Sequence, residues 1–226
     1  MKLSIIIPVF NEKNTITDVV RVVKNVALEK EIIIVDDAST DGSVEILKVI
    51  SREPGIKVLY HEKNMGKGSA IKTALPHITG DLVIIQDSDL EYDPNEYPEL
   101  IEPIIENKAD VVYGSRFLKP NKRIYLRFYL GNKLLSFCIS MLFGKKITDS
   151  YTCYKLFKTE IFKGLKLTSS GFEMEAEITS KLLKSRYRLV EIPINYHPRS
   201  IKEGKKICWK DAVKGLFSML KYRFTK

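Results

Sequence analysis

The first 85 residues alternate between short apolar runs and longer stretches with apolar residues at every third or fourth position. The apolar runs are rich in Ile and Val and cover residues 3–10, 31–35, 56–60 and 81–85. Short, β-branched runs of this kind predict strands that are buried on both faces. Between them, residues 15–26, 44–50 and 69–75 have the spacing of helices with one apolar side. This alternation predicts an α/β fold in which helices flank a mostly parallel central sheet.

Acidic and polar residues follow three of the predicted strands. They are Pro8, Phe10, Asn11 and Glu12 after the first strand, Asp36, Asp37, Ser39 and Asp41 after the second, and Gln86, Asp87, Ser88, Asp89 and Glu91 after the fourth. Ligands of parallel sheets bind beyond the carboxyl ends of the strands, so these loops form the candidate site. Carboxylates on one edge repel one another, and a divalent cation or the hydrogen-bond donors of a ligand would relieve that repulsion. Hard oxygen ligands favour Mg or Mn over Zn.

Other interpretations of these loops stay open at this point. The acids after the second and fourth strands could instead cap helices or form turns. Rival phosphate motifs are absent, because Gly66-Lys-Gly68 is not a P-loop and no G-x-G-x-x-G sequence follows the first predicted strand. The sequence therefore gives little support to a P-loop or dinucleotide-binding protein.

Composition limits the class of protein. Hydrophobic residues make up 44 % and charged residues 29 % of the 226 residues, which is typical of a globular chain and excludes wholesale disorder. No apolar run reaches 18 residues, so no spanning helix is expected. The chain reaches Pro8 without the pattern of a signal peptide, and we expect it in the cytoplasm. The scattered Cys138, Cys153 and Cys208 are expected to be small buried or half-buried side chains.

Positive charge is concentrated in the second half of the chain. Lys and Arg number 37 against 28 Asp and Glu, a formal net charge of +9, and residues 119–146 and 202–226 are crowded with Lys and Arg. This distribution indicates a partner that carries phosphate: a nucleotide, a nucleic acid or an anionic membrane. Because no nucleic-acid-binding motif accompanies the charge and the acidic loops would repel such a polymer, no nucleic acid is expected.

Two of the basic segments also have apolar faces. Residues 134–143 are apolar and lie between a basic, aromatic stretch and a pair of lysines. Near the C-terminus, Trp209, Val213, Leu216, Phe217 and Leu220 have helical spacing and alternate with Lys and Arg. Both segments are predicted to be helices lying in a membrane interface. The alternative is that the first is a core helix and the second packs on the sheet.

Taken together, the motifs resemble family 2 glycosyltransferases, which have the GT-A fold. The matching stretches are residues 4–12, 35–42, 64–70 and 86–89, in the family's order and spacing. Residues 114–116, 148–157, 172–175, 193–199 and 203–207 look like the dolichyl-phosphate (polyprenyl-phosphate) sugar synthase branch. The resemblance extends from Met1 to about Arg223. It implies one Rossmann-like GT-A domain over 1–206, with a nucleotide-binding half (1–115) and an acceptor half (116–206) that holds an amphipathic segment (120–146). A basic amphipathic helix (207–226) follows.

The resemblance also implies roles for individual residues. On the donor side, Pro8, Phe10 and Glu12 would flank the base and ribose, and Asp37 would hydrogen-bond the base. Lys67 would lie near the nucleotide and sugar, and Ser88 would be a further binding residue of this site. Asp87 and Asp89 would hold Mg or Mn on the diphosphate, with Glu91 as a third ligand. Arg116, Arg199 and Lys205 would contact phosphates of donor or acceptor. Phe10 departs from the family's usual Tyr and has no hydroxyl to donate.

The implied reaction is an inverting, metal-dependent transfer of a sugar. The donor would be GDP-mannose or a UDP-sugar, and the acceptor polyprenyl or dolichyl phosphate at the cytoplasmic face of the membrane. The alternative is transfer to a hydroxyl of a glycan, lipid or protein, which needs a general base, whereas a phosphate acceptor is already anionic. Asp149 would be that base for a hydroxyl acceptor and a positioning residue for a phosphate, and Glu173 and Glu175 share the same ambiguity. We expect the protein to bind peripherally to the inner face of the membrane. A separate membrane-anchoring partner is compatible with this expectation.

Overall fold

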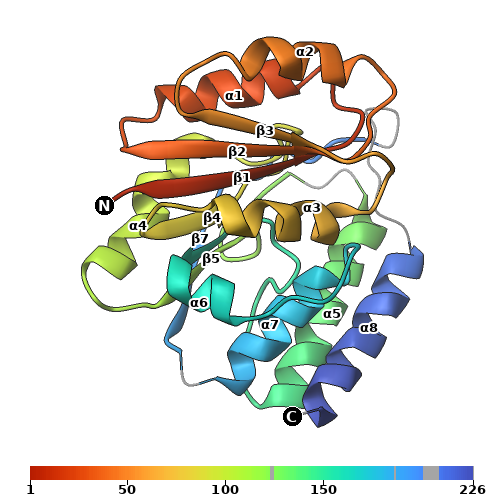
Figure 1. Cartoon of the computed structure of the whole chain (residues 1–226). Helices are drawn as coiled ribbons and strands as arrows, with labels where there is room; N and C mark the ends of the chain where they lie inside the picture. Colours follow the sequence, from red (N-terminus) through yellow and green to blue (C-terminus); the bar gives the residue numbers. More distant parts are fainter. Residues whose placement is uncertain (123–124, 186, 201–208, 226) are drawn as a thin grey trace.

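A seven-stranded sheet runs through the computed structural model, which describes residues 1–122, 125–185, 187–200 and 209–225. The strand order is β3-β2-β1-β4-β6-β5-β7 (Figure 1). The strands are β1 (Leu3–Val9), β2 (Lys30–Asp36), β3 (Ile56–Tyr60), β4 (Leu82–Ile85), β5 (Val111–Ser115), β6 (Lys155–Lys158) and β7 (Leu189–Pro193). Every neighbouring pair is parallel except those of β6, which is antiparallel to both β4 and β5. The predicted α/β class with a mostly parallel sheet is confirmed.

The first four strands lie where the apolar runs predicted them. The helices between them are α1 (Ile16–Asn25), α2 (Ser43–Ile50) and α3 (Lys67–Ala74), followed by a short 3-10 helix, η1 (Leu75–His77). The central strands β1 and β4 are almost entirely buried, whereas β3 at the sheet edge is half exposed. Continuous Ile and Val runs are what a strand covered on both faces requires. This part of the fold therefore follows from local sequence.

The second half of the chain departs from the simple alternation. After η2 (Pro94–Glu96), α4 (Tyr97–Ile105) and β5, the long helix α5 (Leu126–Phe143) precedes β6, which enters the sheet between β4 and β5. Because β6 runs opposite to its neighbours, its amino end lies at the edge where they end. Residues 148–154, which precede β6, are thereby brought to the candidate site.

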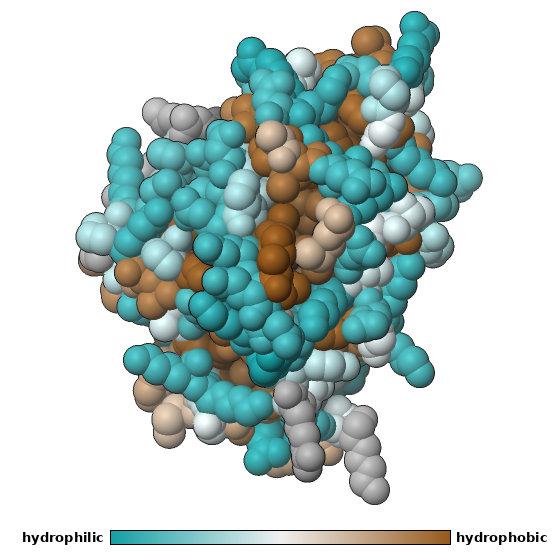
Figure 2. Space-filling view, turned by 90° about the vertical axis from the view of Figure 1, so that its left-hand side faces the viewer, coloured by the Kyte–Doolittle hydropathy of each residue, from teal (hydrophilic) through white to brown (hydrophobic). Residues whose placement is uncertain are grey.

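Helices α5, α7 (Met174–Lys184) and α8 (Trp209–Phe224) pack on one another below the sheet (Figure 1), and α6 (Thr159–Gly164) follows β6 directly. They share an apolar cluster separate from the main core, formed by Leu135, Ile139, Ile147, Tyr151, Ala176, Leu183 and Met219. Within the described ranges, no helix combines the length and hydropathy needed to cross a membrane. The side of the molecule where the N-terminus lies is mostly hydrophilic, with one narrow apolar strip (Figure 2).

Candidate active site

The loops after β2, β1 and β4 lie side by side, because these strands are neighbours in the sheet. Each loop holds one non-glycine residue with left-handed backbone: Asn11 (φ 51°), Ala38 (φ 62°) and Leu90 (φ 59°). Such a conformation costs free energy, above all for Leu and Ala, and it occurs preferentially at functional sites. The predicted gathering of acids at one edge is therefore present, on loops with unusual backbone.

Arg199 joins two of these acidic loops. Its guanidinium donates to both carboxylate oxygens of Glu12, at 2.9 and 3.1 Å, and to Asp89 Oδ2 at 2.8 Å. Glu12 and Asp89 follow different strands, and Arg199 comes from a segment after β7 that is 187 residues beyond Glu12. One cation thus holds together two predicted donor-site acids.

Glu91 fastens the segment that carries Arg199. Its carboxylate accepts hydrogen bonds from the backbone N–H of Arg199, at 2.6 Å, and from the Tyr196 hydroxyl, at 2.9 Å. Its backbone carbonyl accepts from the N–H of His197. These contacts give Glu91 a role in placing Arg199, and its role as a third metal ligand stays a prediction.

Asp87 and Asp89 are the part of the site best suited to a divalent cation. Burial, together with the charges of Asp87 and Glu91, raises the pKa of Asp89 to about 7, although Arg199 opposes the shift. A doubly charged cation would relieve this repulsion, and carboxylate oxygens are the ligands that Mg and Mn prefer. Among the described residues no group of three or more acidic, His or Cys side chains converges on one point. The fit is therefore to a cation held by two protein carboxylates and completed by oxygens of a ligand.

Lys67 connects Asp87 to a buried network behind the loops. Its ammonium lies 2.8 Å from Asp87 Oδ1 and 3.3 Å from Glu175 Oε1. The second Glu175 oxygen binds Lys155, which is fully buried in β6. Burial alone would lower the pKa of Lys67, but the charges of Asp87 and Glu175 outweigh it and raise that pKa. Lys67 is therefore a fixed cation beside the predicted metal site.

The Gly-Lys-Gly sequence places Lys67 by close backbone packing. Gly66 has φ +91°, and a Cβ there would come within 2.5 Å of the Ser170 carbonyl oxygen. The N–H of Gly66 donates to Asp37 Oδ2 at 2.7 Å, and the N–H of Met65 donates to Asp37 Oδ1 at 2.8 Å. His61 Nδ1 lies 2.7 Å from the same Asp37 Oδ1. Asp37 thus organises the loop before α3, and its predicted contact with a base stays a prediction.

The remaining donor-side residues lie on the same edge of the sheet. Ser88 donates its hydroxyl to the carbonyl oxygen of Pro8 at 3.1 Å, which ties the β4 loop to β1. Thr15 donates to Ser88's carbonyl oxygen at 2.7 Å and to Glu12 Oε2 at 3.0 Å. Phe10 is half-buried at the end of β1. Lys205 lies outside the described residues.

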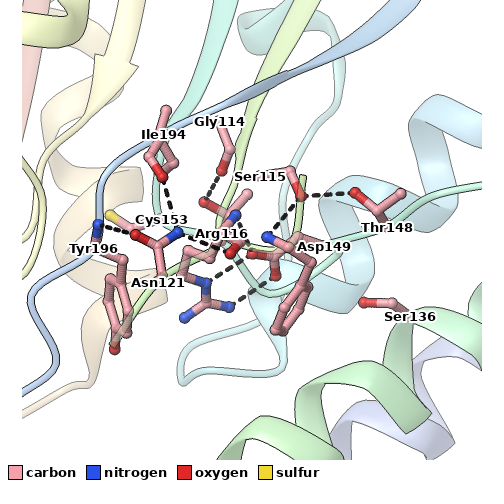
Figure 3. Close-up of polar contacts among 12 residues, drawn as sticks. Gly114, Ser115, Arg116, Asn121, Ser136, Thr148, Asp149, Cys153, Ile194 and Tyr196 are labelled. Atoms are coloured by element: carbon pink, nitrogen blue, oxygen red, sulfur yellow. Dashed lines mark hydrogen bonds and ion pairs between the residues drawn. The ribbon is translucent and has the colours of Figure 1, made fainter. Parts of the chain in front are cut away.

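Arg116 and Asp149 form a closed pair (Figure 3). Arg116 Nε donates to Asp149 Oδ2 and Arg116 Nη2 donates to Asp149 Oδ1, both at 2.7 Å. The backbone N–H of Arg116 also donates to Asp149 Oδ2, at 3.0 Å. Asp149 is fully buried, and the N–H groups of Thr148 and Asp149 bind Glu191. A carboxylate whose two oxygens are both held by a guanidinium is poorly placed to accept a proton from a substrate.

A cavity of about 330 Å³ lies between Arg116, Arg199 and the amino-terminal half of α5. Its lining comprises Arg116, Phe117, Leu118, Lys119, Pro120, Asn121, Lys122, Tyr125, Phe128, Tyr129, Asn132, Tyr196, Pro198 and Arg199. The Arg116 guanidinium lies 5.1 Å from the centre of the Tyr196 ring, a cation–π contact. No Asp, Glu or His occurs among these described lining residues. The cavity is therefore basic and aromatic, and it adjoins the acidic loops through Arg199.

The comparison with protein families is decisive at this point. The model of glycosyl transferase family 2 matches residues 4–165, more than half of the chain. The chain belongs to glycosyl transferase family 2. The match includes all three acidic loops, Lys67 and the Arg116–Asp149 pair.

Individual relatives in the family match most of this chain. A dolichol-phosphate mannosyltransferase from Pyrococcus furiosus is 31 % identical over 214 residues, covering 91 % of this chain and 59 % of the relative. An undecaprenyl-phosphate 4-deoxy-4-formamido-L-arabinose transferase from Edwardsiella ictaluri is 28 % identical over 209 residues, covering 90 % of this chain and 62 % of the relative. The chain therefore spans less than two thirds of the length of these relatives.

Solved structures confirm the GT-A fold. The crystal structure of glucosyl-3-phosphoglycerate synthase from Mycobacterium tuberculosis, in complex with Mn2+, uridine diphosphate and phosphoglyceric acid, superposes with a TM-score of 0.77. It is 19 % identical, and the superposition covers 100 % of this chain and 79 % of the other. At this identity the likeness shows the fold of the family 2 chain alone.

Several residues of the site were not singled out from the sequence. Lys155 carries no local signal, since a lysine in a short strand is usually an edge residue. Asn121 donates to the Arg116 and Ile194 carbonyls at 2.9 and 3.0 Å, and its side-chain oxygen accepts from the N–H of Tyr196 at 3.0 Å (Figure 3). Glu191, which accepts hydrogen bonds from the N–H groups of Thr148 and Asp149, also carries no local sequence signal. All three act through partners distant in sequence, which periodicity does not reveal.

Proposed function

We propose that this chain transfers one sugar, with inversion, from a nucleotide-sugar to a polyprenyl phosphate. Membership of family 2 and the names of its relatives support this class of reaction. The donor would be GDP-mannose or a UDP-sugar, bound on the acidic loops by Pro8, Phe10, Glu12 and Asp37. Transfer would take place at the inner face of the cell membrane, where the chain would be peripherally bound.

On the donor side, Asp87 and Asp89 would hold Mg or Mn. A divalent cation bound there would neutralise the negative charge that develops on the departing nucleoside diphosphate. Arg199 would exchange its contact with Asp89 for contacts with phosphate oxygens, since a guanidinium binds phosphate as well as carboxylate. Lys67 would stay paired with Asp87 and face the sugar and diphosphate. Lys205 is proposed as a further phosphate contact.

On the acceptor side, the lining of the cavity is the observation that carries the choice of substrate. Arg116, Lys119, Lys122 and Arg199 line it, and the described lining includes no carboxylate or histidine to serve as a general base. An acceptor hydroxyl needs a base, whereas a phosphate monoester is anionic at neutral pH. Asp149 would therefore act as a positioning residue, orienting Arg116 toward the acceptor phosphate.

The test is a transfer assay with matched acceptors. The protein is incubated with Mn or Mg, radiolabelled GDP-mannose or UDP-glucose, and either a polyprenyl phosphate or the corresponding polyprenol. We expect label to enter the organic phase only with the phosphate and only when metal is present. Label on the polyprenol, or on a soluble glycan, would instead establish a hydroxyl acceptor. No transfer to any of these acceptors from either donor would overturn the proposal.

A further inference from the structure

Helix α5 carries an exposed apolar stripe in addition to the side that it buries. Leu135 and Ile139 face the cluster shared with α7 and α8. The exposed stripe comprises Leu126, Leu130, Leu134, Phe137 and Met141. Spacings of four, four, three and four residues place these five side chains on one face of the helix. α5 is thus apolar on two sides, and only one of them is covered by the described chain.

Helix α8 repeats this arrangement beside α5. Met219 and Tyr222 are buried against the neighbouring helices. Its exposed stripe comprises Val213, Phe217, Leu220 and Phe224, again spaced by four, three and four residues. Across the two stripes the side chains are between 40 % and 79 % exposed. Nine large apolar side chains on two contacting helices exceed the scattered exposure that is ordinary for a protein surface.

Cations border both stripes. Arg127 and Lys133 are exposed on either side of the α5 stripe, and Lys214 and Lys221 are exposed along the α8 stripe. α5 contains no acidic residue at all, and Asp211 is the single acid in the sequence of α8. Apolar faces bordered by Lys and Arg are the pattern of helices that lie in the plane of a bilayer. This border complements anionic lipid headgroups.

We propose that the stripes of α5 and α8 together form the surface by which this protein docks on an anionic membrane. Leu126, Leu130, Leu134, Phe137 and Met141 of α5 and Val213, Phe217, Leu220 and Phe224 of α8 enter the boundary between headgroups and acyl chains. The bordering lysines and arginines remain at headgroup level. The proposal deepens the proposed function and rests on it in one respect, that a polyprenyl phosphate is met at a bilayer.

The same helix links this surface to the basic cavity. Phe128, Tyr129 and Asn132 of α5 line the cavity, on a different side of the helix from the exposed stripe. A helix is about 10 Å across, so the cavity lies roughly that far from the docked stripe. The acceptor phosphate is then taken up just above the headgroups while its hydrocarbon chain stays in the bilayer. Docking through α5 therefore fixes the height of Arg116 above the membrane.

The experiment measures vesicle binding by flotation, with vesicles of phosphatidylcholine alone or with 30 mol % phosphatidylglycerol. No nucleotide, metal or polyprenyl phosphate is added. We expect the protein to float with the anionic vesicles. Phe137→Ser with Phe217→Ser should reduce the bound fraction at least tenfold, because both apolar anchors are lost. The matched control is Val49→Ser with Ile105→Ser, which are equally exposed apolar residues on α2 and α4 and should leave binding unchanged.

A second pair of variants tests the charged border. Lys214→Glu with Lys221→Glu should weaken binding to anionic vesicles about tenfold or more. The charge-matched control, Lys48→Glu with Lys63→Glu, lies away from the stripes and should weaken it much less. Melting temperatures establish that all variants are folded.

Three results would overturn the proposal. One is no binding of the unaltered protein to anionic vesicles, and another is equal binding by the Phe137→Ser, Phe217→Ser variant. The third is a dimer in lipid-free solution that this variant converts to a monomer, because a second copy would then cover the stripes. Vesicle binding without sugar transfer would contradict the proposed function and leave the docking surface standing. Sugar transfer to a detergent-dispersed acceptor without vesicle binding would contradict the docking surface and leave the proposed function standing.

Discussion

Arg116 and Arg199 both pair with carboxylates, yet the two pairs differ in what they hold. Arg116 makes a closed, bidentate pair with the fully buried Asp149, and both come from the same half of the chain. Arg199 divides its guanidinium between Glu12 and Asp89, on two separate strand ends, and remains partly exposed. The first pair has its acceptors satisfied within the protein. The second bridges two acids that a metal cation could bind, through a guanidinium that could bind phosphate.

The difference indicates how positioning and binding are divided in this site. A buried ion pair is costly to break, because the remaining charge has no partner and little water. A bridging arginine near the surface exchanges partners more readily, because solvent and ligand both offer replacements. We therefore propose that Asp149 positions Arg116 and that Asp89 and Arg199 bind ligand, and the following predictions test this division.

The largest effect is expected at the closed pair. Asp149→Ala should lower the free energy of unfolding by about 3–5 kcal/mol, because Arg116 is left buried and unpaired. Chemical denaturation measures this loss. Replacing both residues, with Arg116→Met and Asp149→Leu, should restore part of the stability. An Asp149→Asn variant as stable as the unaltered protein but without turnover would make Asp149 a base and contradict the division.

At the ligand-binding site the main loss should be in activity. Asp89→Asn should reduce sugar transfer at least about 100-fold and abolish metal-dependent nucleotide binding, because one of two carboxylate ligands is removed. Steady-state kinetics and calorimetry with UDP and GDP measure the two effects. Asp93→Asn is the control, since that carboxylate caps η2 in the same region. Nucleotide binding by Asp89→Asn that still depends on metal would place the cation elsewhere.

A smaller effect is expected when the bridge is removed. Arg199→Met leaves Glu12 and Asp89 without this guanidinium, so Mn2+ should bind about tenfold more tightly while sugar transfer falls. Calorimetric titration with Mn2+ alone gives the affinity. The cost in stability should stay below that of Asp149→Ala. Weaker Mn2+ binding by Arg199→Met would show that Arg199 supports the cation site and does not compete with it.

The smallest effect is expected at a paired carboxylate far from the site. Burial would raise the pKa of Glu31, but hydrogen bonds from Lys2, Ser4 and Thr79 outweigh it and lower that pKa to about 2. Since the folded-state pKa lies below the ordinary 4.5, Glu31 contributes stability that is fully present above pH 4.5 and is lost as pH falls toward 2. Glu31→Gln should cost about 1 kcal/mol at pH 7.

Denaturation at several pH values tests this expectation. The difference between Glu31→Gln and the unaltered protein should shrink between pH 4.5 and 2. A difference that stays constant over this range would show that charge contributes nothing at Glu31. Sugar transfer by the variant should be unchanged, because Glu31 lies at the amino ends of the strands, away from the acidic loops.

The sequence by itself determined the first half of the fold, from β1 to β4. Strands β1 to β4 and helices α1 to α3 lie within about two residues of the predicted ranges. The acids follow β1, β2 and β4 as predicted, and neighbouring strands bring them to one edge. These features depend on local periodicity and on the geometry of parallel strands, both of which a single sequence displays.

Only the tertiary structure decided which of these charges meet. The antiparallel entry of β6 brings Asp149 to Arg116, 33 residues earlier in the chain, and Lys155 to Glu175. The return of the chain after β7 brings Arg199 to Glu12. The tertiary structure likewise decided which apolar side of α5 and of α8 is covered, since on each helix the buried and the exposed apolar residues both have helical spacing. Long-range pairing depends on how whole elements pack on one another, and local periodicity does not show which elements will pack together.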